Sequence, residues 1–241
     1  MPLYLAHFIT LDREDGGSRA GAEISHVFRG ASTNLRYEGH ASYYDDDLGA
    51  GFYVSLPGLL GTKAQQGRDL IGNAAAGAMF AASDEDGQTI AFHIGAMLPT
   101  SYTFRTNNGA TIIPFESRVT DASQTGYDTA YGAQAGISAM RRIGRTFSQF
   151  DLGGEWLHPH SSFHINGALG IDFGNIALLF ESTNGNATSH WTDEGAIGLR
   201  ATLGPAQPYA ALIGGVVENG PENGPAKTYL GFTLGVDMPL Y

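Results

Sequence analysis

The last fifteen residues of the chain alternate almost without interruption between apolar and small or polar side chains. From Lys227 to Tyr241 the sequence reads KTYLGFTLGVDMPLY. One parity is apolar and the other is not, the two sets being Leu230, Phe232, Leu234, Val236, Met238 and Leu240 against Tyr229, Gly231, Thr233, Gly235 and Asp237. Successive residues of a β-strand point to opposite faces of a sheet, so this period of two predicts a strand with one apolar face.

The same alternation recurs along most of the chain, most clearly in 34–44, 88–99, 162–173 and 192–203. Helix signals are nearly absent, and the Ala-rich stretch 72–82 has a glycine spacing that favours a strand with little bulk. The sequence therefore predicts an all-β antiparallel protein forming one domain over residues 1–241.

The connections between these segments are of two kinds. Short turns are expected at Asp45–Asp47, Ser83–Gly87, Arg141–Gly144, Phe173–Asn175 and Gly204–Pro208. Longer polar stretches are expected at 57–68, 104–126, 157–161, 183–191 and 218–226. Short turns at one rim and long loops at the other are typical of outer-membrane β-barrels. An even strand number suits such a barrel, and the length favours twelve strands, with ten or fourteen as alternatives.

Composition separates a membrane barrel from a soluble sandwich or lipocalin-like barrel, which share the period of two. Charged residues make up 15% of the chain, and Lys63 and Lys227 are its two lysines. A soluble sheet surface carries more charge than this. Aromatic residues also gather at segment ends, as they do in the girdles of membrane barrels. These features favour a transmembrane barrel with outer-membrane lipid around it.

The net charge and the absence of cysteine exclude several kinds of partner and site. The formal net charge is -11, which argues against nucleic acid as a partner. The chain has no cysteine, so disulfides, thiolate metal sites and thiol nucleophiles are excluded. No apolar run reaches 18 residues, and no signal peptide precedes the first segment, so we expect a mature form of an exported protein.

Two sets of motifs resemble known families. Thr233, Gly235, Met238 and Leu240 have the spacing of the closing strand of bacterial outer-membrane barrels. The segments DLGAGFYVSLPG, GRDLIGNAAAGAMF and FHIGAMLPT, within 47–100, resemble the phenol-degradation-pathway (MetA-like) outer-membrane proteins. The second resemblance covers under a third of the chain. It implies an outer-membrane channel for hydrophobic or aromatic small molecules, and it brings no catalytic residues.

The non-apolar parity of the strands defines a candidate lumen. Its members are polar or charged side chains that alternate with the apolar ones: Arg36, Glu38, His40, His93, Asp151, Glu155, His164, Asn166, Asp172, Glu181, Glu194, Arg200 and Asp237. Seven acids against two arginines predict a net negative interior. The sequence is compatible with two interpretations of this interior. It is either a packed polar core with no path through it, or a narrow channel in which Gly, Ala and Ser leave space.

Three alternatives compete with a channel. His160 and Ser162 have the His-x-Ser spacing of outer-membrane lipid hydrolases, although Phe163 stands where those enzymes have Asn and Ser162 has lumen parity. His158, His160 and His164 share a parity that could hold a metal, but no acid is fixed beside them, and no metal or cofactor is expected. A structural barrel that acts through its loops is the third.

The sequence also has acidic stretches, and they do not have the pattern of calcium-binding loops. The Asp-rich stretches 12–16, 45–47 and 84–87 lack the twelve-residue loop with a terminal Glu, so ordinary turn chemistry is expected. The sequence thus favours a bacterial outer-membrane channel for passive passage of small solutes, with 104–126 as an inward loop that narrows it. The solute and the oligomeric state stay undetermined.

Overall fold

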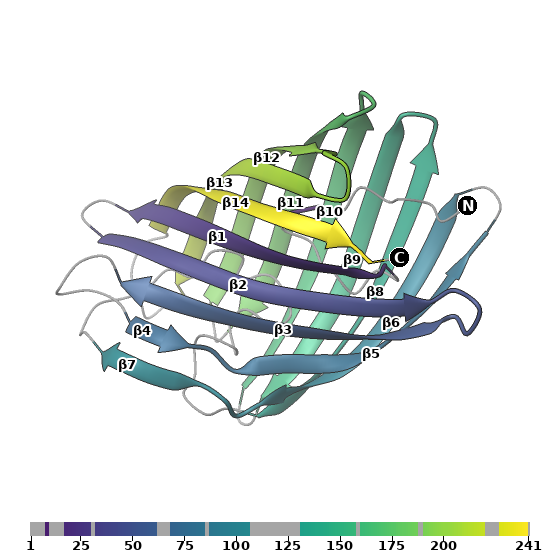
Figure 1. Ribbon diagram of the computed structural model, residues 1–241. Coiled ribbons are helices and arrows are strands. Elements are labelled where there is room, and N and C mark those ends of the chain that lie inside the picture. The colour runs from purple at the N-terminus through teal and green to yellow at the C-terminus, as the bar shows by residue number, and fades with distance from the viewer. Residues whose placement is uncertain are drawn as a thin grey trace.

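The computed structural model describes residues 8–9, 17–29, 32–61, 68–84, 87–106, 131–157, 160–187, 190–219 and 227–240 (Figure 1). These residues form fourteen strands: β1 Arg19–Arg29, β2 Ser32–Asp45, β3 Ala50–Gly61, β4 Arg68–Ile71, β5 Ala74–Ser83, β6 Gln88–Leu98, β7 Tyr102–Thr106, β8 Gly132–Ile143, β9 Thr146–Leu157, β10 His160–Asp172, β11 Ile176–Ala187, β12 His190–Ala201, β13 Gln207–Asn219 and β14 Lys227–Pro239. Within these ranges no helix is long and apolar enough to cross a membrane.

The strands close into an antiparallel barrel. β1 pairs with β2 on one side and with the closing strand β14 on the other, where Ile24 lies opposite Leu234. β2 pairs in turn with β3, which completes the ring. β4 and β5 are two parts of one wall strand, broken at Gly72 and Asn73, and β6 and β7 are two parts of the next, broken at 99–101. The wall therefore has twelve strands, which confirms the predicted fold class and strand number.

A shared bend crosses the two interrupted wall strands and lies beside Pro57 of β3. The N–H of Gly72 donates to the carbonyl of Pro57 in β3 at 2.7 Å. The N–H of Ala74 donates to Oγ1 of Thr100 at 2.8 Å, and the N–H of Ser101 donates to Oδ1 of Asn73 at 3.0 Å. Pro and Gly interrupt ladder pairing, and here side-chain oxygens satisfy backbone groups that the interruption frees. The motifs that resemble the MetA-like family lie at this bend.

One rim is closed by tight turns. Each has a glycine with positive φ, a conformation that other L-residues adopt at a cost: Gly49, Gly87, Gly144, Gly174 and Gly204. β1 begins and β14 ends at this same rim, where Arg19 lies opposite Pro239. This is the layout expected for a periplasmic rim.

The expected long connections are partly wrong. β9 and β10 extend to Leu157 and from His160, so 157–161 is no long loop. β11 and β12 likewise take up most of 183–191, and β3 takes up 57–61. These strands continue beyond the point where clear alternation ends, because ladder hydrogen bonds need no particular side chains.

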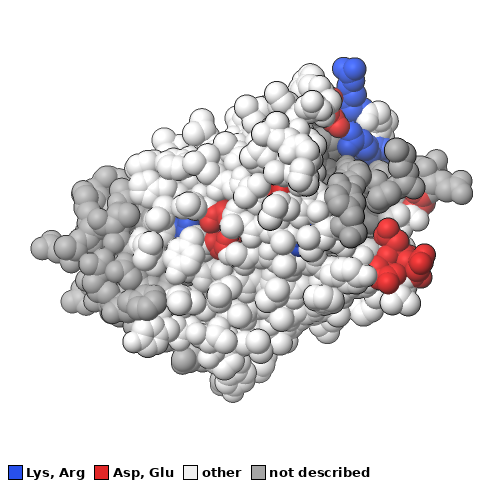
Figure 2. All heavy atoms as spheres, viewed as in Figure 1, with Lys and Arg blue, Asp and Glu red and all other residues white. Residues whose placement is uncertain are grey.

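The two faces of the wall differ sharply. Apolar side chains on one parity remain exposed on the outside, for example Leu199 at 54% and Leu234 at 50%, while Thr233 and Arg36 on the other parity are fully buried. Figure 2 shows a barrel surface that is largely free of charge, with most of the charged side chains in view gathered at one end. An exposed apolar band around a polar interior is the inverse of a soluble barrel and matches a membrane-spanning one.

Aromatic rings lie over glycines inside the wall. A methyl group added at Gly235 would lie 2.3 Å from the ring of Tyr209, and one added at Gly170 would lie 2.0 Å from the ring of Phe147. These sites admit only glycine unless the ring moves. Part of the high glycine content thus serves to seat interior aromatic side chains flat against the wall.

Candidate functional site

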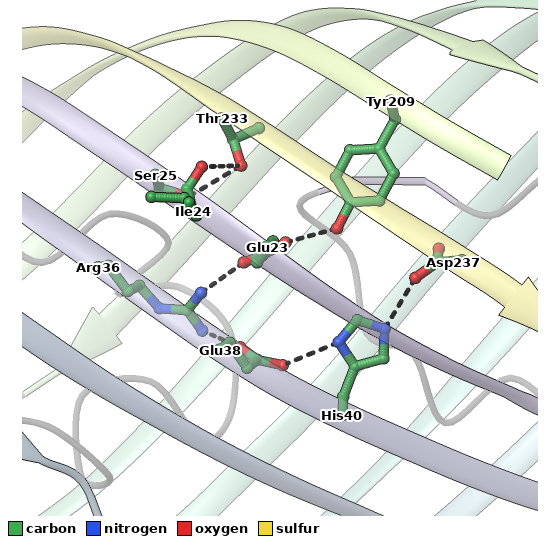
Figure 3. A network of polar contacts seen from close by, with 9 residues as sticks. All are labelled: Glu23, Ile24, Ser25, Arg36, Glu38, His40, Tyr209, Thr233 and Asp237. Carbon is green, nitrogen blue, oxygen red and sulfur yellow. Dashed lines mark hydrogen bonds and ion pairs between the residues drawn. The ribbon is translucent and has the colours of Figure 1, made fainter. Parts of the chain in front are cut away.

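A chain of ion pairs runs across the interior of β1, β2, β12 and β14, and we call it the ionic ladder: Glu23, Arg36, Glu38, His40, Asp237 and Arg200. Figure 3 shows the central side chains of this network directed toward one another. Arg36 forms ion pairs with both Glu23 and Glu38. Strand alternation places these side chains on the inward face, because 36, 38 and 40 share a parity in β2.

His40 and Arg200 extend the ladder to the closing strand. Nε2 of His40 lies 2.8 Å from Oδ1 of Asp237, and its Nδ1 lies 3.7 Å from Oε1 of Glu38. Nη1 of Arg200 donates to the other oxygen of Asp237 at 2.7 Å. Charges taken out of water are tolerated only when they are paired and hydrogen-bonded, and the ladder meets that condition by sharing each carboxylate between two partners.

Tyr209 of β13 joins the ladder to its surroundings. Its hydroxyl donates to Oε2 of Glu23 at 2.9 Å, and the guanidinium of Arg200 lies over its ring, 4.8 Å from the centroid. Beside it, the hydroxyl of Ser25 donates to Oγ1 of Thr233 at 2.9 Å. The ladder therefore ties together the strands on both sides of the β1–β14 closure.

A second interior region is apolar, and we call it the apolar seat: Phe147, Leu179, Ala196, Gly198, Ala211 and Ile213, from β9, β11, β12 and β13. Its occupant is the described part of the N-terminal segment, Phe8 and Ile9, both buried within this cluster. The rings of Phe8 and Phe147 lie 5.3 Å apart between centroids. The N–H of Ile9 donates to Oε1 of Glu181 at 2.7 Å.

Most of the remaining buried polar side chains among the described residues lie on β6 and β8 to β12. Gln134 donates to the hydroxyl of Tyr53, whose ring meets His93 edge-on at 6.0 Å. On β9 and β10, Ser162 donates to Glu155 at 3.3 Å. The other residues expected in the lumen are also buried on this parity, namely Asp151, His164, Asn166 and Glu194. Glu194 accepts a hydrogen bond from Tyr229.

Asp172 lies apart from the other expected lumen residues. It pairs with Arg142 at the rim of tight turns, and both side chains are about one quarter exposed. Its Oδ1 also accepts the N–H of Gly174 at 2.7 Å. Asp172 therefore supports the turn at the mouth rather than the middle of the barrel.

The buried charge includes residues that the sequence reading missed. Arg19 and Glu23 are 1% and 2% exposed, on the same parity as Ser25 and Val27 in β1. Their alternation with Ala20, Ala22 and Ile24 was a usable signal for the inward face of β1. Among the described buried residues, seven acids face three arginines, so the interior carries a formal excess of negative charge.

The alternative sites gain little support. Ser162 lies on the inward face, away from lipid; the side chain of His160 and all of His158 lie outside the described residues. No cluster of three potential metal ligands occurs in the part of the chain that the structure describes. Asp45 accepts the N–H groups of Asp47 and Leu48 at 3.0 and 3.1 Å, which is turn chemistry.

The expected inward loop at 104–126 is wrong in its first residues. Residues 104–106 belong to strand β7, and most of the segment, from 107 onward, lies outside the described residues. That the loop narrows the barrel stays a prediction.

Comparisons with known proteins support the class that the fold defines. The chain is similar in structure to the COG4313 outer membrane channel from Pseudomonas putida F1, with a TM-score of 0.70 and 10% identity over 100% of this chain and 99% of that one. It is also similar to the KdgM porin, with a TM-score of 0.57 and 8% identity over 92% and 99%, and to the CymD monoaromatic hydrocarbon channel, with a TM-score of 0.50 and 8% identity over 94% and 89%.

At the level of sequence there is no match. No family model matches the chain, and no curated protein matches it either. The structure and its likenesses thus define a closed twelve-stranded barrel of the outer-membrane porin type.

Proposed function

We propose that this protein is a channel of a bacterial outer membrane that passes small solutes passively. The observation that carries the proposal is the sidedness of the wall. Apolar side chains cover its outside, while ion pairs, histidines and amides occupy its inside. Such a wall satisfies its backbone hydrogen bonds by closure and can stand in lipid.

The interior charge sets the expected selectivity. Buried carboxylates outnumber buried arginines by seven to three among the described residues. A low-dielectric wall strengthens the field of such an excess, and salt screens it over about 10 Å at 0.1 M. Cations and neutral solutes should therefore pass in preference to anions, most clearly at low salt.

A bilayer recording tests the proposal directly. Folded protein, verified by heat-modifiable mobility on a gel, is inserted into planar bilayers under a KCl gradient. We expect discrete conductance steps and a reversal potential of the sign that cation flow gives, moving toward zero as both salt concentrations rise. Folded protein without conductance would support the structural barrel instead, and a reversal potential of anion sign would contradict the selectivity.

The solute class is a further part of the proposal. The resemblance of 47–100 to MetA-like outer-membrane proteins favours hydrophobic or aromatic solutes. CymD, a structural neighbour, is described as a monoaromatic hydrocarbon channel. The apolar seat supports the same class here, because it gives an apolar solute a surface inside an otherwise polar barrel.

A further inference from the structure

The occupant of the apolar seat has two chemical parts. The first is apolar: Ile9 is completely buried, and its Cδ1 lies where a side chain at Gly198 would begin, 2.6 Å from a methyl group added there. Phe8 contributes an aromatic ring against Phe147. Glycine at 198 thus leaves a hollow in the wall that an aliphatic or aromatic group fills.

The second part is a hydrogen-bond donor. The N–H of Ile9 points at Oε1 of Glu181, 2.7 Å away, in a buried setting. Glu181 lies two residues from Leu179 on β11, so the carboxylate and the apolar surface share one inward face. An ionised carboxylate only accepts hydrogen bonds, so the polar end of this site selects donors and repels anions.

We propose that the apolar seat and Glu181 form a solute-binding subsite for small amines with an apolar or aromatic body. Phe8 and Ile9 are its internal occupants. A protonated amine in this place makes a charge-assisted hydrogen bond to Glu181, which is shorter and roughly twice as strong as a neutral one. An alcohol of the same shape binds more weakly, and a carboxylate is excluded. This inference rests on the proposed channel and names its solute class.

Direct binding tests the subsite without reference to conductance. Isothermal titration of detergent-folded protein, corrected with protein-free micelles, compares 2-phenylethylammonium, 2-phenylethanol and 3-phenylpropionate, which share one aromatic body. We expect the ammonium to bind most tightly and the carboxylate not at all. Equal affinities for the three would overturn the proposal.

Two variants locate the binding. Glu181→Gln should weaken binding of the ammonium about tenfold or more, because the ammonium then donates to a neutral amide oxygen and loses its ion pair with the carboxylate. Glu155→Gln removes the same charge from β9 away from the seat and should change the affinity less than about twofold. Equal losses in both would mean a general field effect and would overturn the subsite.

Smaller side chains at positions 8 and 9 should raise the affinity for the ammonium, whereas Glu181→Gln should lower it. Phe8→Ala combined with Ile9→Ala removes the competing side chains, so the ammonium should bind more tightly than to the unaltered protein. An unchanged or weaker affinity in this variant would show that the solute does not bind where Phe8 and Ile9 lie. If the protein conducts but binds the three probes equally, the proposed subsite is wrong and the proposed channel stands. If it binds them selectively but does not conduct, the proposed channel is wrong and the proposed subsite stands.

Discussion

The ionic ladder and the apolar seat are neighbouring parts of one interior that are stabilised in opposite ways. In the ladder, each charged group depends on a named partner, as Arg36 depends on Glu23 and Glu38. In the seat, Leu179 and Ile213 pack against a separate segment of chain, and no single pair is decisive. The ladder joins the strands of the β1–β14 closure through paired charges, whereas the seat holds its occupant by apolar packing.

The largest effect should come from breaking the ladder at Arg36. Arg36→Ala removes the arginine that forms ion pairs with both Glu23 and Glu38, and it should lower the free energy of unfolding by about 3–5 kcal/mol. Urea unfolding of the protein folded reversibly into lipid vesicles measures it. Adding Glu23→Gln and Glu38→Gln to Arg36→Ala should recover part of the loss, because no uncompensated carboxylate then stays buried. A triple variant as unstable as the single one would trace the loss to packing rather than charge.

A charge placed on the outer face should lower the free energy of unfolding almost as much. This loss is a reference for the losses expected in the ladder and in the seat. Leu199 is exposed on the outside, while the next residue, Arg200, is buried in the ladder. Leu199→Arg should cost about 2–4 kcal/mol if it lies near the bilayer midplane. Leu199→Phe is the matched control and should be close to neutral in the same unfolding measurement. An arginine tolerated at 199 as well as phenylalanine would contradict the sidedness of the wall.

Truncating a side chain of the apolar seat should lower the free energy of unfolding less than breaking the ionic ladder does. Leu179→Ala should lower the free energy of unfolding by about 2–3 kcal/mol, the lower part of the range for a buried leucine, because neighbouring side chains can close part of the gap. Leu212→Ala, on the exposed outer face of β13, is the control and should cost less. Equal losses at both sites would mean that the seat is not packed as described.

The smallest effect should come from the neutral hydrogen bond beside the ladder. Ser25→Ala removes the donor to Thr233 and should cost about 1 kcal/mol. A double-mutant cycle with Thr233→Val measures the coupling, which should be positive but well below that of Arg36 with its acids. Absence of coupling would show that the two hydroxyls act separately.

Much of the wall could be predicted from residue order alone. In β6, Ile90, Phe92 and Ile94 were expected outside and His93 inside, and the structure places them so. The prediction works because a strand turns each successive side chain to the other face. It failed for the length of β9 to β12, since backbone pairing continues through stretches such as 183–187 whose side chains show no clear pattern.

The site was predictable only as a set of inward residues. Parity put Glu38, His40 and Asp237 on the inner face, but Asp237 is 197 residues from His40, and only closure of β14 onto β1 brings them together. Glu181 was also expected inside, yet nothing in the order of residues indicated that Ile9 would donate to it across the barrel.

By itself, the sequence determined the fold class, the two faces of the wall and the excess of acids within it, because these follow from a period of two and from which side chains lipid tolerates. The tertiary structure decided which inward side chains meet. Strand register, the β1–β14 closure and the return of Phe8 and Ile9 into the barrel set those contacts, and each depends on residues far apart along the chain, whose pairing no local pattern specifies.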